Sequence, residues 1–329
     1  MKVMKKRVLS GIRATGRLHL GNYLGAVKGM LALQGDDQYE TFYMVADLHT
    51  IITPYKPDEL RKNVREVVLD YLAAGLNPKK SVIFAQSQVP EHVELAYLFS
   101  TLVSVARMQH LPTFKEKVKQ YPQAVTMALL NYPVLMTADI LIYKADLVPV
   151  GIDQEPHLEV AREIARKMNE RYGLSFPEPQ RFATAGEYIP SLTGEGKMSK
   201  SVSGSFITLT DDLPTIKDKL AKVPTDEGHG LSIPQEGGVA TLLALVELFE
   251  GKKKRNSYEE QYTNGGVKYQ ALKEELADAI HKELEPIQKR RTEFEKDPQK
   301  AEQILEDGAN RARVVAQETL REVKKAMGL

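Results

Sequence analysis

Four short apolar runs, each bounded by charged or turn-forming residues, lie in the first half of the chain. They are RVLSGI at 7–12, TFYMVADL at 41–48, SVIFAQS at 81–87 and DLVPVG at 146–151. Their shortness and their content of Val, Ile and Phe are typical of strands buried within a sheet. We therefore predict four strands.

Helical patterns fall between these runs. In the clearest one, DELRKNVREVVLDYLAAG at 58–75, apolar residues recur at helical spacing, with Asp58 as a candidate N-cap and Gly75 as a candidate C-cap. Strands that alternate with helices predict an α/β fold with a Rossmann-like parallel sheet and right-handed crossovers. In such sheets, ligands bind beyond the carboxyl ends of the strands, next to helix N-termini.

Two other regions are helical by pattern. Residues from about 90 to 145 predict a helical insertion in the sheet, and after residue 205 the strand signals fade. We therefore divide the chain into a Rossmann-type part at 1–205, with a polar loop at 194–205, and a smaller all-helical part at 206–329. We expect the last helix to pack back on the first part.

Composition limits the class of protein. The chain of 329 residues is 42% hydrophobic and 27% charged with a net charge of +1, which is ordinary for a globular protein. It has no cysteine, so disulfides and cysteine-ligated zinc or iron–sulfur sites are excluded. No apolar run is long enough to span a membrane and we recognise no signal peptide, so we expect a cytoplasmic protein without a membrane partner.

The stretch TGRLHLGNYLGA at 15–26 is the first candidate for chemistry. It follows the first predicted strand, and every charged residue before Asp36 is basic. Glycines allow a close approach of the backbone to a ligand, helix N-terminal amides bind phosphate, and His19 can donate a hydrogen bond to phosphate oxygens. A glycine-containing connection without a ligand has the same composition, so this stretch alone decides nothing.

The loop GKMSKS at 196–201 is the second candidate. Its lysines can neutralise a pyrophosphate as charge develops. Read alone, the loop also fits a polar surface linker.

A third candidate is NYPVLMTADILIY at 131–143. Tyr132, Met136, Asp139 and Tyr143 share one helical face, and Asp139 is flanked by apolar residues. A carboxylate buried there needs a partner, which is either an internal ion pair or the N–H or O–H of a ligand. The Tyr and Met residues also fit a plain core stripe. Downstream, Asp153 and Gln154 follow a predicted strand end, where an Asp is well placed for ribose hydroxyls.

The two loops together resemble the paired signatures of class I aminoacyl-tRNA synthetases. His19-Leu20-Gly21-Asn22 stands where that family has His-Ile-Gly-His, and Lys197-Met198-Ser199-Lys200-Ser201 is unaltered. GNYLGA at 21–26, ADLH at 46–49, FKEK at 114–117, YPVLMTAD at 132–139 and VGIDQ at 150–154 resemble the bacterial tryptophanyl branch of the family, over nearly the whole chain.

The resemblance implies roles for the residues of these matching motifs. L-tryptophan would be held by Gly11, His49, Tyr132, Met136, Gln154 and Asp139, with Asp139 accepting the indole N–H. ATP would be held by Arg13, Ala14, Thr15, Gly21, Asn22, Gly151, Ile152, Asp153, Ile189 (through its backbone), Lys197, Met198, Ser199, Lys200 and Ser201. Catalysis at the phosphates would rest on His19, Asn22, Lys117, Lys197, Lys200 and Ser201.

The implied reaction is ATP-dependent activation of tryptophan, assisted by Mg²⁺, followed by transfer to tRNA(Trp). The resemblance also implies a homodimer, an anticodon-binding role for 206–329 and no dedicated metal site. We interpret the basic run KKKR at 252–255 as a solvated loop. Relatives with an iron–sulfur cluster exist, but a chain without cysteine cannot hold one of that kind.

Two departures and three alternatives remain open. Arg13-Ala14-Thr15 stands where many relatives have Gln-Pro-Ser, and Ile152 where Glu is frequent. A tyrosyl-tRNA synthetase shares the fold and both signatures, and a buried Asp accepts a phenol as readily as an indole. A small-molecule nucleotidyltransferase shares the first signature. A synthetase-like regulatory or accessory protein would keep the fold without the activity.

Overall fold

The structure, a computed structural model, describes residues 5–184, 186 and 188–329 and has a parallel five-stranded sheet at its centre. The strands are β1 (Lys6–Arg13), β2 (Tyr39–Ala46), β3 (Ser81–Ala85), β4 (Leu147–Pro149) and β5 (Gln180–Phe182), in the order β3-β2-β1-β4-β5. β1 pairs with β2 along its whole length, from Lys6 opposite Tyr39 to Arg13 opposite Ala46. The predicted Rossmann-like parallel sheet is confirmed.

Helices connect and cover these strands. The first part contains α1 (Leu20–Asn22), the π-helical turn η1 (Tyr23–Val27), α2 (Lys28–Gln34), α3 (Pro57–Ala74), the 3₁₀ turns η2 (Gln86–Gln88) and η3 (Ile152–Gln154), and α8 (Glu155–Tyr172). The insertion contains α4 (Glu91–Ser100), α5 (Val105–Gln109), α6 (Pro112–Gln120) and α7 (Met127–Ile142). The helical part contains α9 (Leu213–Ala221), α10 (Gly237–Glu250), α11 (Lys252–Asn264), α12 (Tyr269–Glu295) and α13 (Pro298–Met327).

Side chains of the strands alternate between two apolar cores. Tyr43 and Val45 of β2 belong to the core shared with α2, α3 and α12, whereas Phe42 and Met44 belong to the core shared with α4, α7 and α8. A sheet buried on both faces requires strands that are apolar at nearly every position, which is the pattern of these runs.

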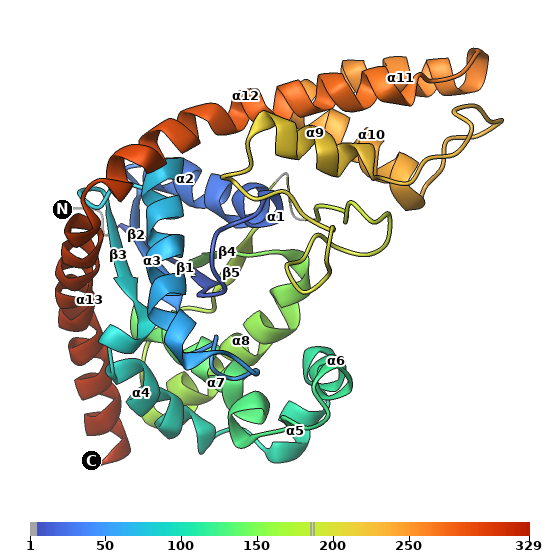
Figure 1. Ribbon diagram of the computed structural model, residues 1–329. Helices are drawn as coiled ribbons and strands as arrows, with labels where there is room; N and C mark the ends of the chain where they lie inside the picture. The colour runs from blue at the N-terminus through green and yellow to red at the C-terminus, as the bar shows by residue number, and fades with distance from the viewer. Residues whose placement is uncertain (1–4, 185, 187) are drawn as a thin grey trace.

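The helical part is joined to the sheet by two long helices. Figure 1 shows α12 running from the helical part over α2 and α3, and α13 running alongside β3. The contact of α13 is close at Gly308, where a Cβ atom would lie 1.8 Å from the carbonyl oxygen of Ile83. Among the helices that the structure describes, none is long and apolar enough to cross a membrane.

Three local expectations are wrong. A fifth strand, β5, was missed because it has only three residues and follows Pro177 and Pro179. Asp58 does not cap α3: Pro57 takes the first helical position, so Lys56 is the N-cap, although Gly75 ends the helix as expected at φ 118°. The run at 252–255 is helical, since it forms the start of α11.

Candidate functional site

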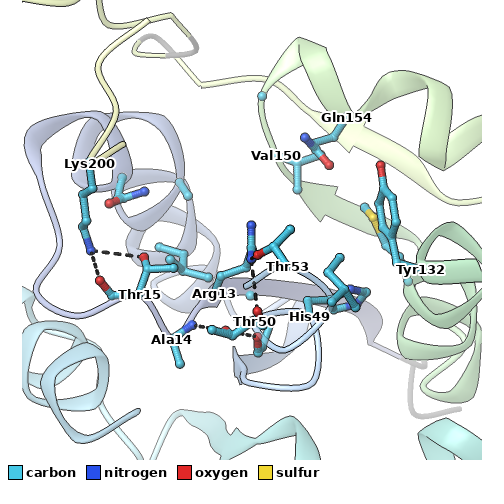
Figure 2. Close-up of a pocket in the computed structure, with 18 of the residues that line it drawn as sticks. Arg13, Ala14, Thr15, His49, Thr50, Thr53, Tyr132, Val150, Gln154 and Lys200 are labelled. Atoms are coloured by element: carbon cyan, nitrogen blue, oxygen red, sulfur yellow. Dashed lines mark hydrogen bonds between the residues drawn. The ribbon is translucent and has the colours of Figure 1, made fainter. Parts of the chain in front are cut away.

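A cavity of about 890 Å³ opens at the carboxyl ends of β1, β2 and β4. Figure 2 shows Lys200 and Thr15 on one side of this cavity, Tyr132 and Gln154 on the other, and Arg13 between them. The predicted site residues that line it are Gly11, Arg13, Ala14, Thr15, His19, Gly21, Asn22, His49, Lys117, Tyr132, Met136, Asp139, Gly151, Asp153, Gln154, Lys197, Met198, Ser199, Lys200 and Ser201. Segments that are far apart in the sequence therefore meet in one place.

Two predicted residues are not part of the cavity lining. The side chain of Ile152 is 60% exposed, and that of Ile189 is fully buried in the core. The carbonyl oxygen of Ile189 accepts the backbone N–H of Met198 at 2.8 Å. Ile189 therefore helps to hold the loop at 197–201, and its predicted backbone contact with adenine stays a prediction.

His19 occupies the turn between β1 and α1 as the N-cap of that helix. The imidazole Nδ1 of His19 accepts a hydrogen bond from the backbone N–H of Gly21 at 3.1 Å. The backbone N–H of His19 donates to Asn22 Oδ1 at 3.2 Å. Burial, together with the charges of Lys200 and Lys197, lowers the pKa of His19 to about 3. The imidazole is therefore neutral, and its remaining Nε2–H is a fixed donor suited to an anionic oxygen.

The KMSKS loop at 197–201 and His19 line the same cavity. Lys200 Nζ donates to the carbonyl oxygens of Thr15 and Gly16 at 3.1 and 3.0 Å, and burial lowers its pKa to about 8. Lys197 Nζ lies 3.1 Å from Asp153 Oδ1. Lys197 and Lys200 line the same cavity as His19 and Asn22, and the positive charge of the two ammonium groups makes this end of the cavity attract anions.

Asp139 lies at the other end of the cavity, fully buried. Its carboxylate accepts from His49 Nε2 at 2.7 Å, from Gln86 Nε2 at 2.8 and 3.0 Å, and from His92 Nδ1 at 2.5 Å. Burial alone would raise the pKa of Asp139, but the hydrogen bonds from His49 and His92 outweigh it and lower the pKa to about 2. The partner that the sequence required is therefore an internal cluster, part of which faces the cavity.

Sequence reasoning missed two members of this cluster. Gln86 directly follows β3, and His92 lies in the first turn of α4, where its Nε2 lies 2.7 Å from the hydroxyl of Tyr143. The position of Gln86 at a strand's carboxyl end was the available signal. Nothing in the sequence pairs His92 with a carboxylate 47 residues away.

His157 links three elements around Tyr132. His157 Nε2 lies 2.8 Å from the hydroxyls of both Tyr132 and Thr113, and its Nδ1 lies 3.0 Å from Gln154 Oε1. Burial, followed by the nearby His49, lowers the pKa of His157 to about 4. His157 therefore acts as a neutral brace that orients Tyr132 and Gln154 toward the cavity.

Arg13 stands in the wall between the two ends. Its Nη2 donates to Thr53 Oγ1 at 2.7 Å and to the carbonyl oxygen of Thr50 at 3.3 Å, while its buried Nε has no hydrogen-bond partner among the described residues. Burial lowers the pKa of Arg13, and burial together with the charge of Arg13 lowers the pKa of Lys117. Two neighbouring cations thus line the cavity midway along it, where an anionic group of a ligand would satisfy them.

A parallel sheet that carries a His-Leu-Gly-Asn turn after its first strand, faced by a KMSKS loop across one cavity, is the architecture of a class I tRNA synthetase. The family model described as tRNA synthetases class I (W and Y) matches residues 2–285. The chain belongs to this family.

The relatives are similar over their full length. A tryptophan–tRNA ligase of Rickettsia conorii is 41% identical over 332 residues, which cover 99% of each chain. The crystal structure of tryptophanyl-tRNA synthetase from Mycoplasma pneumoniae has a TM-score of 0.85 at 32% identity, covering 99% of this chain and 98% of that one. A complex of the Campylobacter jejuni enzyme with ADP and tryptophan has a TM-score of 0.82 at 30% identity, covering 98% of this chain and all of that one.

Proposed function

We propose that this protein is a tryptophan–tRNA ligase, which activates L-tryptophan with ATP and transfers the tryptophanyl group to tRNA(Trp). The observation that carries the proposal is the single cavity with a buried acceptor cluster at one end and a cationic, helix-capped end opposite. The proposal is supported by sequence identity of about 40% to tryptophan–tRNA ligases over nearly the full length of the chain.

Tryptophan occupies the end formed by α7. Asp139 accepts the indole N–H, with His49 beside it, and Met136 packs against the ring. Tyr132 and Gln154 hold the ammonium group, and Gly11 lines the cavity at a position where a Cβ would lie 2.6 Å from Met44 Cγ and displace that side chain. A buried acceptor of this kind penalises an amino acid that lacks the matching N–H, because the carboxylate would lose a hydrogen bond it is built to accept.

ATP occupies the opposite end. Gly151 and Asp153 hold the ribose, while His19, Asn22, Lys117, Lys197, Lys200 and Ser201 hold the phosphates. Mg²⁺ would be bound by the phosphate oxygens of ATP. Lys117, Lys197 and Lys200 would neutralise the phosphate charge that Mg²⁺ leaves.

The reaction proceeds in two steps. A carboxylate oxygen of tryptophan attacks the α-phosphorus of ATP, the bond to the β-phosphate breaks, and tryptophanyl-adenylate and pyrophosphate form. The tryptophanyl group then moves to the terminal ribose of the tRNA, and AMP leaves. No protein nucleophile is needed, because positioning and stabilisation of charge at phosphorus supply the catalysis.

The helical part at 206–329 is proposed to read the anticodon. Two basic residues of the KKKR run form ion pairs within this part: Lys254 with Glu275 at 2.5 Å, and Arg255 with Glu247 at 2.6 Å. Lys252 and Lys253 are exposed at the start of α11 and available to phosphate. The enzyme is proposed to work as a homodimer in the cytoplasm, with one tRNA spanning both protomers.

Pyrophosphate exchange with tryptophan and with tyrosine tests the activity. Tryptophan should support exchange with the higher kcat/KM of the two amino acids. Exchange with tyrosine alone would identify a tyrosyl enzyme. Adenylate formation with tryptophan but no charging of tRNA(Trp) would instead favour an accessory role.

A further inference from the structure

A buried charge cluster connects α12 to the turn that carries His19. Arg291 of α12 is surrounded by Asp70 and Glu66 of α3 and by Glu295, and its side chain is 3% exposed. Arg291 Nη1 pairs with Asp70 Oδ1, Nη2 lies 2.5 Å from Glu66 Oε2, and Nε lies 2.8 Å from Glu295 Oε1. Because Asp70 and Glu66 belong to α3, their ion pairs with the buried guanidinium hold α12 against α3.

Each of the two α3 carboxylates also accepts a hydrogen bond from one of the two residues that precede His19. Asp70 Oδ2 accepts the backbone N–H of Leu18 at 2.6 Å, and Glu66 Oε2 accepts from Arg17 Nε at 2.9 Å. Because Leu18 immediately precedes His19 in the sequence, the position of its backbone determines the position of the His19 side chain. The guanidinium of Arg291 is therefore connected through Asp70 to the backbone of Leu18, at the start of the turn that carries His19.

The same helix holds the strand-like segment that pairs with this turn. Leu18 and Leu20 exchange backbone hydrogen bonds with Leu209 and Ile207, at 3.0 and 2.9 Å. Gln288, one turn before Arg291 on α12, donates to the carbonyl oxygens of Leu209 and Asp211 at 3.0 and 2.9 Å. α12 thus holds the His19 segment through Asp70 and also holds its pairing partner at 207–209, which follows the KMSKS loop in the sequence.

We propose that Arg291 and Asp70 are positioning residues for adenylate formation, which set the placement of His19 from the helical part. The inference rests on the proposed reaction. Burial raises the pKa of Asp70 even beside Arg291, and loss of the Arg291 charge would raise that pKa further, which favours the protonated carboxyl group, a weaker acceptor for Leu18. A small displacement of a group that contacts the transferring phosphate is enough to slow the chemical step.

The test compares three variants in tryptophan-dependent pyrophosphate exchange. Arg291→Lys keeps the charge but not the fork of donors, and the double variant Arg291→Met with Asp70→Asn removes both charges while an amide oxygen remains for Leu18. Both should lower kcat about 10- to 100-fold, with the KM for tryptophan within about twofold. Arg290→Met is the matched control: Arg290 Nε donates to Ala73 O at 2.6 Å, which also joins α12 to α3 but does not reach the His19 turn.

Amide hydrogen exchange supplies a readout that does not depend on activity. The amides of residues 17–20 should exchange faster in both Arg291 variants than in Arg290→Met. Unchanged kcat and unchanged exchange at 17–20 in a folded Arg291 variant would overturn the proposal, and so would failure of both Arg291 variants to fold, which would make the cluster a stability element. An inactive wild-type protein would instead overturn the proposed function.

Discussion

His49 Nε2 lies 2.7 Å from Asp139 Oδ2, and this pair closes the deep end of the cavity. The carboxylate is fully buried, whereas the side chain of His49 is 10% exposed. Because Gln86 and His92 also donate to Asp139, the carboxylate is held as an anion in a fixed orientation. The same contacts that satisfy Asp139 inside the protein also orient it toward a ligand.

Substitution of Asp139 should separate these two roles. Asp139→Ala leaves three buried donors without an acceptor, which should cost about 3–5 kcal/mol of unfolding free energy. Asp139→Asn keeps the shape and should weaken tryptophan binding about 10- to 100-fold, because a hydrogen bond to a charged acceptor is lost. Urea unfolding and tryptophan titration measure the two effects, and the KM for ATP should stay within about twofold.

Thr137→Val is the control for that experiment. Thr137 is buried on the same helix, and its hydroxyl donates to the carbonyl oxygen of Pro133 at 2.9 Å, away from the cavity lining. It should keep wild-type affinity for tryptophan. Wild-type affinity in a folded Asp139→Asn protein would mean that Asp139 serves the fold alone.

The parts of the site that sequence reasoning predicted are local. A glycine-rich turn after a strand, a KMSKS loop and a carboxylate on an apolar helix each have a signature within a few residues. The partners of Asp139 have no such signature, since Gln86 and His92 reach it only through the order of the parallel strands. The N-cap of α3 was missed for a local reason, because Pro57 takes the first helical position one residue before Asp58. The contacts of the buried His157 with Thr113, Tyr132 and Gln154 likewise could not be predicted from any spacing in the sequence.

Lys200 should give the enzyme an alkaline limit. Its ammonium group has to be protonated to stabilise charge on the phosphates, and burial lowers its pKa to about 8. The value of kcat/KM for ATP should therefore fall as the pH rises above about 8, since this parameter reports groups of the free enzyme. Arg in its place stays charged, so Lys200→Arg should be slower by about 10-fold or more but lose the alkaline decline.

Lys115→Arg checks that assignment. Lys115 is exposed on α6 and does not line the cavity, so this variant should keep both the wild-type rate and the alkaline decline. A decline above pH 8 that persists in Lys200→Arg would assign it to a different group.

His157 should make the protein sensitive to mild acid. Its folded-state pKa is about 4, below the ordinary value of 6.5, because the ring is buried. Between these values the unfolded chain binds a proton that the folded protein does not, so the free energy of unfolding falls as the pH falls, by roughly 1.4 kcal/mol per pH unit. Urea unfolding between pH 7 and 4 should show a shallower pH dependence for His157→Gln. His229→Gln, a change at an exposed ring, should keep the wild-type slope.

The insertion should form the contact between protomers. Val93, Tyr97, Val105 and Met127 on α4, α5 and α7 are 51%, 73%, 57% and 75% exposed, so the insertion leaves four large apolar side chains unburied. Light scattering should show that Tyr97→Lys combined with Met127→Lys converts a dimer into a monomer, with tRNA charging reduced more than pyrophosphate exchange. Val314→Lys, at a 69% exposed position on α13, should leave the dimer intact.

Removal of the Arg13 side chain should identify which anion it binds. The guanidinium is fixed by Thr53 and Thr50 midway along the cavity, close to Lys117, with the buried Nε unpartnered among the described residues. Arg13→Gln should weaken the binding of its anionic partner about 10-fold or more, because a charge-assisted hydrogen bond is lost. If that partner is the carboxylate of tryptophan, binding of tryptamine, which lacks the carboxylate, will be unchanged. If it is a phosphate, the KM for ATP will rise while tryptophan and tryptamine bind as in the wild type. Unchanged binding of all three would leave Arg13 as a link between β1 and the segment at 50–53, with no role toward the substrates.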